Sequence, residues 1–533
     1  MTSASRLRRL TLALAAAVLL AGESTSASPP PRPDTAATAG EVAFANSGSA
    51  AAQRPFLLGL ALLHDFEYAR AAELFRQAQA ADPTFAMAYW GEAMTYNHPI
   101  WMQQDRTAAR AVLTRLAPTA EGRAAMARTP REAAWLHAVE TLYGEGAKET
   151  RDELYASELA RLHARFPDDV DATAFYALAL LGTAHHGRDF ATYMRSAALL
   201  EDVFPTHQHH PGVVHYLIHS YDDPIHAPLG MRAARLYGAL APDAPHALHM
   251  TSHIFIALGL WDEVIAANLA AERVVNARNA AKGAPPDACF HYAEWLQYAY
   301  LQERRAPEEA EVRARCQGLA TGPEAAGSTR AMVSYTGMLA ALAADSAALL
   351  PTLEALDTQE PTARFQLAYA RALAAGQDAS RLNAAVTDLH AAQSTLKQRP
   401  PGEEPGARMA EEALQSVMVE EADALALAAS GHLEAAIAAV RVAAGHETAT
   451  PLEFGPPAVP KPTFELLGDL ELRAGRAAEA AEAYQQALAR APGRTSSLLG
   501  LQRAQHALGQ SEAAAGTNAT LARYVHESAG RDR

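Results

Sequence analysis

The chain has 533 residues, of which 49% are hydrophobic and 20% are charged, and its formal net charge is −15. This length is too great for one ordinary compact core, and charged residues are too few for a disordered or fibrous chain. The negative charge argues against non-specific binding of nucleic acid, which needs a basic surface. Two cysteines are too few for a disulfide scaffold or a cysteine-ligated zinc module.

The N-terminal segment, residues 1–27, has the layout of a secretory signal peptide. Three arginines within residues 6–9 precede an apolar run over residues 10–21, and small and polar residues follow up to Ala27. Because the apolar run is too short for a permanent membrane span, we expect cleavage after Ala27 and no transmembrane segment in the mature chain. The sequence therefore predicts export to the periplasm or the extracellular space. Residues 28–50, rich in proline and alanine, are expected to form an extended linker.

Two widely separated segments share one pattern of small, aromatic and proline residues. Near the N-terminus the pattern consists of Gly59, Ala71, Phe75, Ala78 and Pro83, and near the C-terminus it consists of Gly468, Ala480, Tyr484, Ala487 and Pro492. This pattern resembles the tetratricopeptide repeat, whose period of about 34 residues also separates Gly475 from Gly509.

The resemblance implies an all-α fold, a right-handed solenoid of stacked antiparallel helix pairs. Small residues let the two helices of a pair approach closely, and each pair leaves an apolar face that only the next pair can cover. We expect a first solenoid over residues 51–395 with a histidine-rich centre at about 180–295, a linker over residues 396–410, and a C-terminal repeat block over residues 411–533.

Histidines crowd into the centre of this predicted solenoid. His215 and His219 have i, i+4 spacing, as do His249 and His253, and the second pair follows the first by one repeat period, about 34 residues. On a helix, residues with i, i+4 spacing share one face, which is how one helix offers two ligands to one metal ion. The resemblance further implies that these helix positions face the concave groove. We therefore predict a transition-metal site built from the four histidines.

Other polar residues nearby extend the candidate site. The additional candidate ligands are His246, His291 and His185. Asp222 and Asp223 follow His219 and are candidates for a base or for a carboxylate that orients an imidazole. We expect at least one of these two aspartates to lie in a solvated turn, because a proline follows them.

The ligand set favours copper, with zinc and iron as alternatives. No H-E-x-x-H, C-x-x-C-H or C-x-x-C motif is present, whereas imidazole ligands suit copper, zinc and iron, and copper has the highest affinity. The paired H-x-x-x-H segments also resemble the ligand spacing of the coupled binuclear copper proteins, an analogy in spacing and not in fold. This interpretation predicts a metal-dependent oxidoreductase, with a hydrolase as the less favoured class, acting on a small molecule in the groove. No catalytic side chain can be assigned.

Two alternatives remain open at this stage. The resemblance implies an adaptor that binds a peptide or protein partner in its groove, with the flanking repeats near residues 56–95 and 464–510 as further partner surface. In that case the histidines supply hydrogen bonds or pH sensitivity. Cys289 and Cys316 could form a disulfide in an oxidising compartment, or could be two separate buried thiols.

Overall fold

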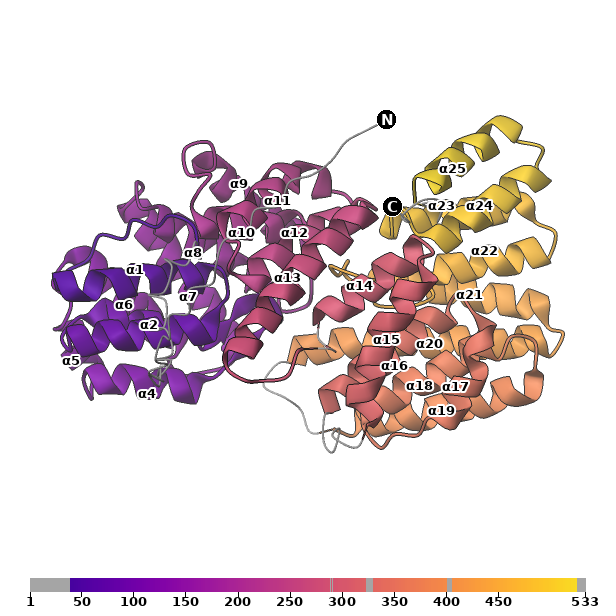
Figure 1. Ribbon diagram of the computed structural model, residues 1–533, viewed down its shortest axis with the longest axis horizontal. Coiled ribbons are helices and arrows are strands. Elements are labelled where there is room, and N and C mark those ends of the chain that lie inside the picture. Colours follow the sequence, from indigo (N-terminus) through magenta and orange to yellow (C-terminus); the bar gives the residue numbers. More distant parts are fainter. Residues whose placement is uncertain (1–38, 288, 290, 323–328, 400–404, 525–533) are drawn as a thin grey trace, which may run out of the picture. The chain divides into compact units, whose positions relative to one another are not determined.

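The computed structural model describes residues 39–287, 289, 291–322, 329–399 and 405–524, which form one compact unit (Figure 1). The predicted signal peptide, residues 1–27, lies outside the described residues. So do residues 28–38 of the first predicted linker and residues 400–404 of the second.

The described part of the chain is almost entirely helical. Its N-terminal and central helices are α1 (Ala50–His64), α2 (Tyr68–Ala81), α3 (Ala86–Met94), α4 (Arg106–Leu116), α5 (Ala120–Ala124), α6 (Pro130–Leu142), α7 (Lys148–Arg165), α8 (Val170–Leu181), α9 (Phe190–Val203), α10 (Pro211–Tyr221), α11 (Ala227–Leu240), α12 (Pro245–Ala257) and α13 (Trp261–Ala281). The later helices are α14 (His291–Gln302), α15 (Ala306–Thr321), α16 (Thr329–Ala343), α17 (Leu350–Ala355), α18 (Pro361–Ala374), α19 (Ala379–Lys397), α20 (Pro405–Ala429), α21 (Leu433–Ala449), α22 (Thr463–Arg473), α23 (Ala477–Arg490), α24 (Thr495–Ala507) and α25 (Ser511–Tyr524). Two short 3₁₀ turns are η1 (Pro99–Trp101) and η3 (Ala347–Leu349).

A small β-ribbon interrupts the helices after α3. It consists of β1 (Asn97–His98) and β2 (Gln103–Gln104), which pair antiparallel with Asn97 opposite Gln104. The 3₁₀ turn η1 joins the two strands.

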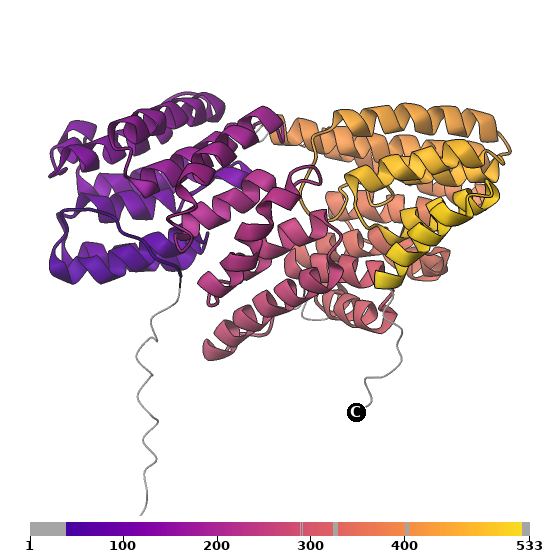
Figure 2. The same cartoon turned by 90° about the horizontal axis from the view of Figure 1, so that it is seen from above.

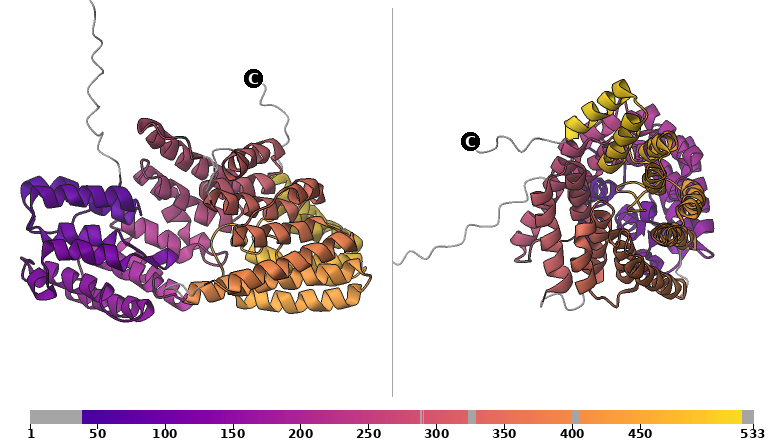
Figure 3. Two further views of the ribbon diagram at one scale, coloured as in Figure 1. Left: turned by 90° about the horizontal axis from the view of Figure 1, so that it is seen from below. Right: turned by 90° about the vertical axis from the view of Figure 1, so that its right-hand side faces the viewer.

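Helices pack in the order expected for stacked pairs. Most consecutive helices contact each other, and many alternate helices also make contact, as in α8 with α10, α10 with α12 and α22 with α24. Figure 2 shows several of these helices lying nearly side by side in layers, and Figure 3 shows the helices from α14 to α25, coloured from red to yellow, following one another along a curve. The predicted fold class, an all-α solenoid of helix pairs, is confirmed.

A glycine at the contact between two helices explains how the pair of α22 and α23 packs closely. Gly468 of α22 faces the ring of Tyr484 in α23, and a Cβ atom at position 468 would lie 2.7 Å from the Tyr484 Cζ atom. Such a distance is shorter than van der Waals contact permits, so only glycine allows the aromatic ring to fill this space. The same motif near the N-terminus places Phe75 between Gly59 and Gly91.

The described residues that precede α1 are packed against the first repeats. Phe44 is buried, and its ring lies 5.7 Å from that of Trp90 and 5.8 Å from that of Trp135. The Arg131 guanidinium also lies on the Phe44 ring, at 3.8 Å from its centroid. Among the residues that the structure describes, no helix combines the length and the apolar character needed to cross a bilayer.

Candidate metal centre

Helices α10 and α12 carry the two predicted histidine pairs. Each helix begins with a proline, whose fixed backbone angle suits the first helical turn and whose missing amide hydrogen costs nothing there. The two helices contact each other, so their matching faces meet. The four side chains are buried, with exposures between 0% and 2%, at His215, His219, His249 and His253.

The first histidine group consists of His215, His219 and His246. One ring nitrogen from each can be chosen so that all three lie within 4.8 Å of one another. The Nδ1 atom of His215 lies 2.6 Å from the backbone oxygen of His64, an atom that can only accept a hydrogen bond. Nδ1 of His215 therefore carries the proton, and its Nε2 presents a lone pair 3.2 Å from Nε2 of His246.

The second group consists of His249, His253 and His291, again with ligand nitrogens within 4.8 Å. His249 donates from Nδ1 to Oδ1 of Asn268 at 2.7 Å, and the amide orientation is fixed because Nδ2 of Asn268 donates to the Val264 backbone oxygen. His253 donates from Nδ1 to the carboxylate of Asp222 at 2.8 Å. Both Nε2 atoms therefore present lone pairs, and they lie only 3.3 Å apart.

Asp222 connects the two groups. Its Oδ2 atom accepts from Nδ1 of His253 at 2.8 Å and from Nδ1 of His219 at 3.3 Å, while Arg188 forms an ion pair with its other oxygen. Burial alone would raise the pKa of Asp222, but the Arg188 guanidinium and the two histidine hydrogen bonds hold it below its usual range. An ionised carboxylate behind a ligand histidine fixes the ring orientation and makes the imidazole more basic.

His219 has the same tautomer as His215, His249 and His253, with its proton on Nδ1. Its Nδ1 proton points to Asp222, and within the described residues its Nε2 is buried and has no hydrogen-bond partner. An unpaired buried acceptor costs free energy unless a ligand occupies the space in front of it.

Burial keeps the other histidines neutral. It lowers the pKa of His215, His246 and His249 well below their ordinary values, with nearby imidazoles adding to the effect. It lowers the pKa of His291 to about 3. For His253, burial outweighs the hydrogen bond to Asp222, and the pKa is again lowered. Neutral imidazole is the form that binds metal ions, so these residues are in the ligand form at neutral pH.

Aromatic side chains from distant parts of the chain cover the histidines. The ring of Phe66, between α1 and α2, lies 4.4 Å from that of His215, and Phe66 has a positive φ of 56°. Phe454, in the segment between α21 and α22, stacks on His253 at 4.7 Å. The histidines are therefore enclosed, and do not line an open concave groove as the resemblance implied. Of the six, only His246 and His291 are partly exposed.

The structure separates His185 from the two groups. Helix α8 ends at Leu181, so His185 lies in the following turn, where its Nε2 contacts Asp152 at 3.0 Å. Asp223 also lies outside the two groups: its side chain bonds to His226 and lies 3.5 Å from Arg188.

The expectation that at least one of the two aspartates lies in a solvated turn is wrong. Asp222 and Asp223 have exposures of 1% and 0%. Burial is tolerated because Arg188 pairs with both carboxylates and backbone amides at residues 225 and 226 donate to Asp223. Arg188 was not predicted from the sequence, although its distance from Asp222 along the chain, one repeat length, could have indicated it.

A separate cluster, His64, Asp171 and His210, was not predicted from the sequence. Asp171 accepts hydrogen bonds from Nε2 of His64 at 3.0 Å and from Nε2 of His210 at 3.3 Å. Nδ1 of His64 accepts from the Tyr216 hydroxyl, and Nδ1 of His210 accepts from the backbone amide of Val213. Because every ring nitrogen already has a partner of opposite polarity, this cluster is a completed hydrogen-bond network.

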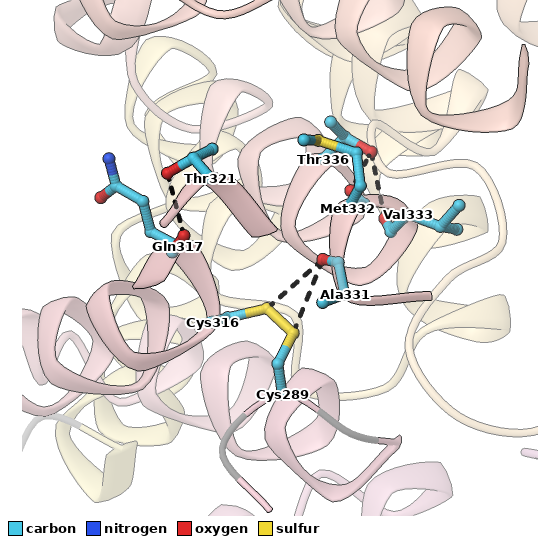
Figure 4. The surroundings of a disulfide bond; sticks show 8 residues. All are labelled: Cys289, Cys316, Gln317, Thr321, Ala331, Met332, Val333 and Thr336. Carbon is cyan, nitrogen blue, oxygen red and sulfur yellow. Dashed lines mark hydrogen bonds between the residues drawn. A yellow bond between two sulfur atoms is a disulfide. The ribbon is translucent and has the colours of Figure 1, made fainter. Parts of the chain in front are cut away.

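A disulfide joins Cys289 and Cys316 (Figure 4). The Cα atoms lie 4.5 Å apart, within the range of ordinary disulfides. This bond ties α15 to the segment just before α14, the helix that begins at His291. Of the two alternatives left open by the sequence, the structure has the disulfide.

Comparisons with known proteins give only distant similarities. No protein-family model matches the sequence, and no curated protein matches it. Matching solved structures include the APC/C hetero-tetramer Cut9–Hcn1, at 13% identity and a TM-score of 0.36, with 86% of this chain and 78% of that chain covered. Yeast Tom70 matches at 10% identity and a TM-score of 0.32, covering 86% and 89% of the two chains. The human IFIT1 dimer with m7Gppp-AAAA matches at 13% identity and a TM-score of 0.32, covering 90% and 91%.

The fold assignment rests on the chain itself. Histidine pairs and glycines recur at the repeat period, consecutive helices contact each other, and at many places alternate helices do so as well. These are the properties of stacked helix pairs of the tetratricopeptide kind. The chain is a tetratricopeptide-type α-solenoid.

Proposed function

We propose that this chain is an exported metalloprotein that binds a transition metal through its two histidine groups, with copper favoured over zinc and iron. The support is the donor chemistry, because the candidate ligands are imidazoles without thiolates, and copper leads the affinity order for such ligands. Export to the periplasm or the extracellular space is proposed from the basic and apolar layout of residues 1–27.

The orientation of lone pairs is the observation that carries this proposal. Nε2 of His249 and Nε2 of His253 face each other at 3.3 Å, while Asn268 and Asp222 engage the Nδ1 protons. Two acceptor atoms repel each other at this distance unless a cation or a shared proton lies against both. Since burial disfavours protonation of these rings, a metal ion is the better partner.

The number of ligands in each group favours a catalytic metal site over a structural one. Three imidazoles leave at least one coordination position open, as in catalytic metal sites, whereas structural sites are closed by four protein ligands. With copper as the metal, we propose oxidation or reduction of a small molecule at this open position. Hydrolysis at zinc is the less favoured reaction.

Elemental analysis of the mature chain tests the proposal. Residues 28–533 would be produced by export without a histidine tag, dialysed and analysed beside the double variant His215→Ala/His253→Ala, which removes one ligand from each group. The matched control is His390→Ala, an exposed histidine on α19. We expect stoichiometric metal in wild type and control and loss of most of it in the double variant. Equal metal content in all three proteins would refute the proposal.

A second candidate function is a metal-free adaptor for a peptide or protein partner. Solenoids of helix pairs commonly provide extended binding surfaces, and an open cavity of about 950 Å³ lies apart from the two histidine groups. Its lining carries both charges, including Arg131, Arg165 and Asp168. If this function is correct, Arg165→Glu weakens binding of the partner while removal of metal with a chelator changes nothing.

A further inference from the structure

The two histidine groups lie side by side. The ring centroids of His219 and His253, one from each group, are 5.6 Å apart, and those of His246 and His249 are 6.3 Å apart. Within each group the ligand nitrogens converge to within 4.8 Å. In the described part of the chain two sets of three imidazoles therefore converge, and a further group of His219, Asp222 and His253 joins one histidine of each set through the shared carboxylate.

We propose that the centre is binuclear, with one metal ion in each group and a small anion such as hydroxide bridging the two ions. The inference rests on the proposed metal binding and adds the number of ions and the class of ligand. Its first support is the adjacency of the groups, because metal ions held by neighbouring sets of ligands can contact one small ligand from both sides, as in two-metal enzymes.

Charge balance is the second support, and it indicates an anion. The six imidazoles are neutral ligands and contribute no negative charge. Asp222 is the carboxylate in contact with them, and Arg188 pairs with it and with Asp223. Two divalent ions in a buried site therefore carry more positive charge than these side chains neutralise. A bridging anion supplies the missing negative charge at a place where both ions can share it.

The shared carboxylate is the third support. One oxygen atom, Oδ2 of Asp222, accepts hydrogen bonds from a histidine of each group, at 3.3 Å from His219 and 2.8 Å from His253. The orientation of both rings therefore depends on one atom, which fixes the two rings relative to each other. His246 and His291, one in each group, are the two partly exposed members of the six.

Copper titration combined with electron paramagnetic resonance tests the proposal. The metal-free mature chain would be loaded with Cu(II), dialysed, and analysed for copper content and spin intensity before and after addition of azide as the bridging anion. The variants His246→Ala and His291→Ala each remove one ligand from a different group, and His390→Ala is the matched control. We expect about two copper ions per wild-type chain and a signal per copper well below that of isolated Cu(II), either as loaded with hydroxide as the bridge or after azide replaces it, because Cu(II) ions that share a bridging anion couple magnetically.

The variants separate the two groups. Each of His246→Ala and His291→Ala should retain about one copper ion, with a signal that azide does not quench. One copper ion per wild-type chain, or two ions whose full signal survives azide, would overturn the binuclear centre while leaving metal binding intact. Wild type that retains no copper here, and no zinc or iron in the elemental analysis, would instead overturn the proposed function itself.

Discussion

Replacement of Asp222 by asparagine tests the role of the carboxylate between the histidine groups. The change preserves the size of the side chain and removes its negative charge. The asparagine amide nitrogen would face either a histidine N–H or the guanidinium of Arg188, all of which are donors. At least one of the three present hydrogen bonds is therefore lost.

The magnitudes follow from the contacts. Removal of one partner of a buried ion pair costs about 3–5 kcal/mol, and we expect the lower end, since Asp223 stays 3.5 Å from Arg188. Loss of an outer carboxylate behind ligand histidines lowers metal affinity by about 10- to 100-fold, or about 1.4–2.7 kcal/mol. Asp222→Asn should therefore reduce both the stability of the metal-free chain and its affinity for copper.

Two measurements separate these effects. Urea unfolding of the metal-free proteins gives the free energy of unfolding, and competition with a chelator of known affinity gives copper binding. Asp223→Asn is the matched control, since Asp223 also contacts Arg188 but bonds to His226, outside the two groups. We expect the control to lose stability and keep its copper affinity. If Asp222→Asn and Asp223→Asn bind copper as tightly as wild type, the carboxylate does not orient the ligands and the reasoning fails.

Three further predictions concern stability. Gly468→Ala should lower the free energy of unfolding by about 1–3 kcal/mol, because the new methyl group meets an aromatic ring at 2.7 Å. Gly445→Ala, in a helix with open space around it, should instead raise the free energy of unfolding by about 0.5–1 kcal/mol. Urea unfolding of both variants checks this prediction. Burial raises the pKa of Glu421 well above its usual value, so the contribution of this residue to wild-type stability should fall as pH rises above about 4.5, by up to about 1.4 kcal/mol per pH unit. The free energy of unfolding of Glu421→Gln minus that of the wild type should therefore grow from pH 5 to pH 7. If this difference is the same at both pH values, the pKa of Glu421 is not raised. Reduction of the Cys289–Cys316 disulfide should cost about 3–4 kcal/mol, measured by unfolding with and without reductant, and the double serine variant should show no response to reductant.

The repeat pattern was sufficient to predict the fold class and the relation between the two histidine pairs. An i, i+4 spacing places two side chains on one face of a helix. A spacing of one repeat period places the second pair at the equivalent position on the corresponding helix of the next repeat. Both relations are local or periodic, so the sequence carries them directly. His246 was predicted as an extra ligand because it precedes His249 by three residues and can share its helix face, and His291 because it opens the next predicted helix; the structure brings both to the pairs.

The burial of the site could not be predicted in this way. Phe66 and Phe454, which cover the histidines, are separated by most of the chain and belong to connections between helices, where no repeat fixes the side-chain direction. His185 was predicted to close a helix at the rim of the groove, but that helix ends at Leu181. Its pairing with Asp152 depends on a loop conformation that periodicity does not encode.

The repeat also explains why the two groups are so similar and where they differ. Position 222, one repeat before Ile256, carries a carboxylate in the first repeat and an aliphatic side chain in the second. A strict repetition would supply each group with its own aspartate. Instead each group has one histidine bonded to the shared Asp222 and one bonded to a neutral oxygen, from the His64 backbone in one case and from Asn268 in the other. The two groups thus have the same types of outer contact with one shared buried carboxylate between them, so loss of that carboxylate should weaken both groups together.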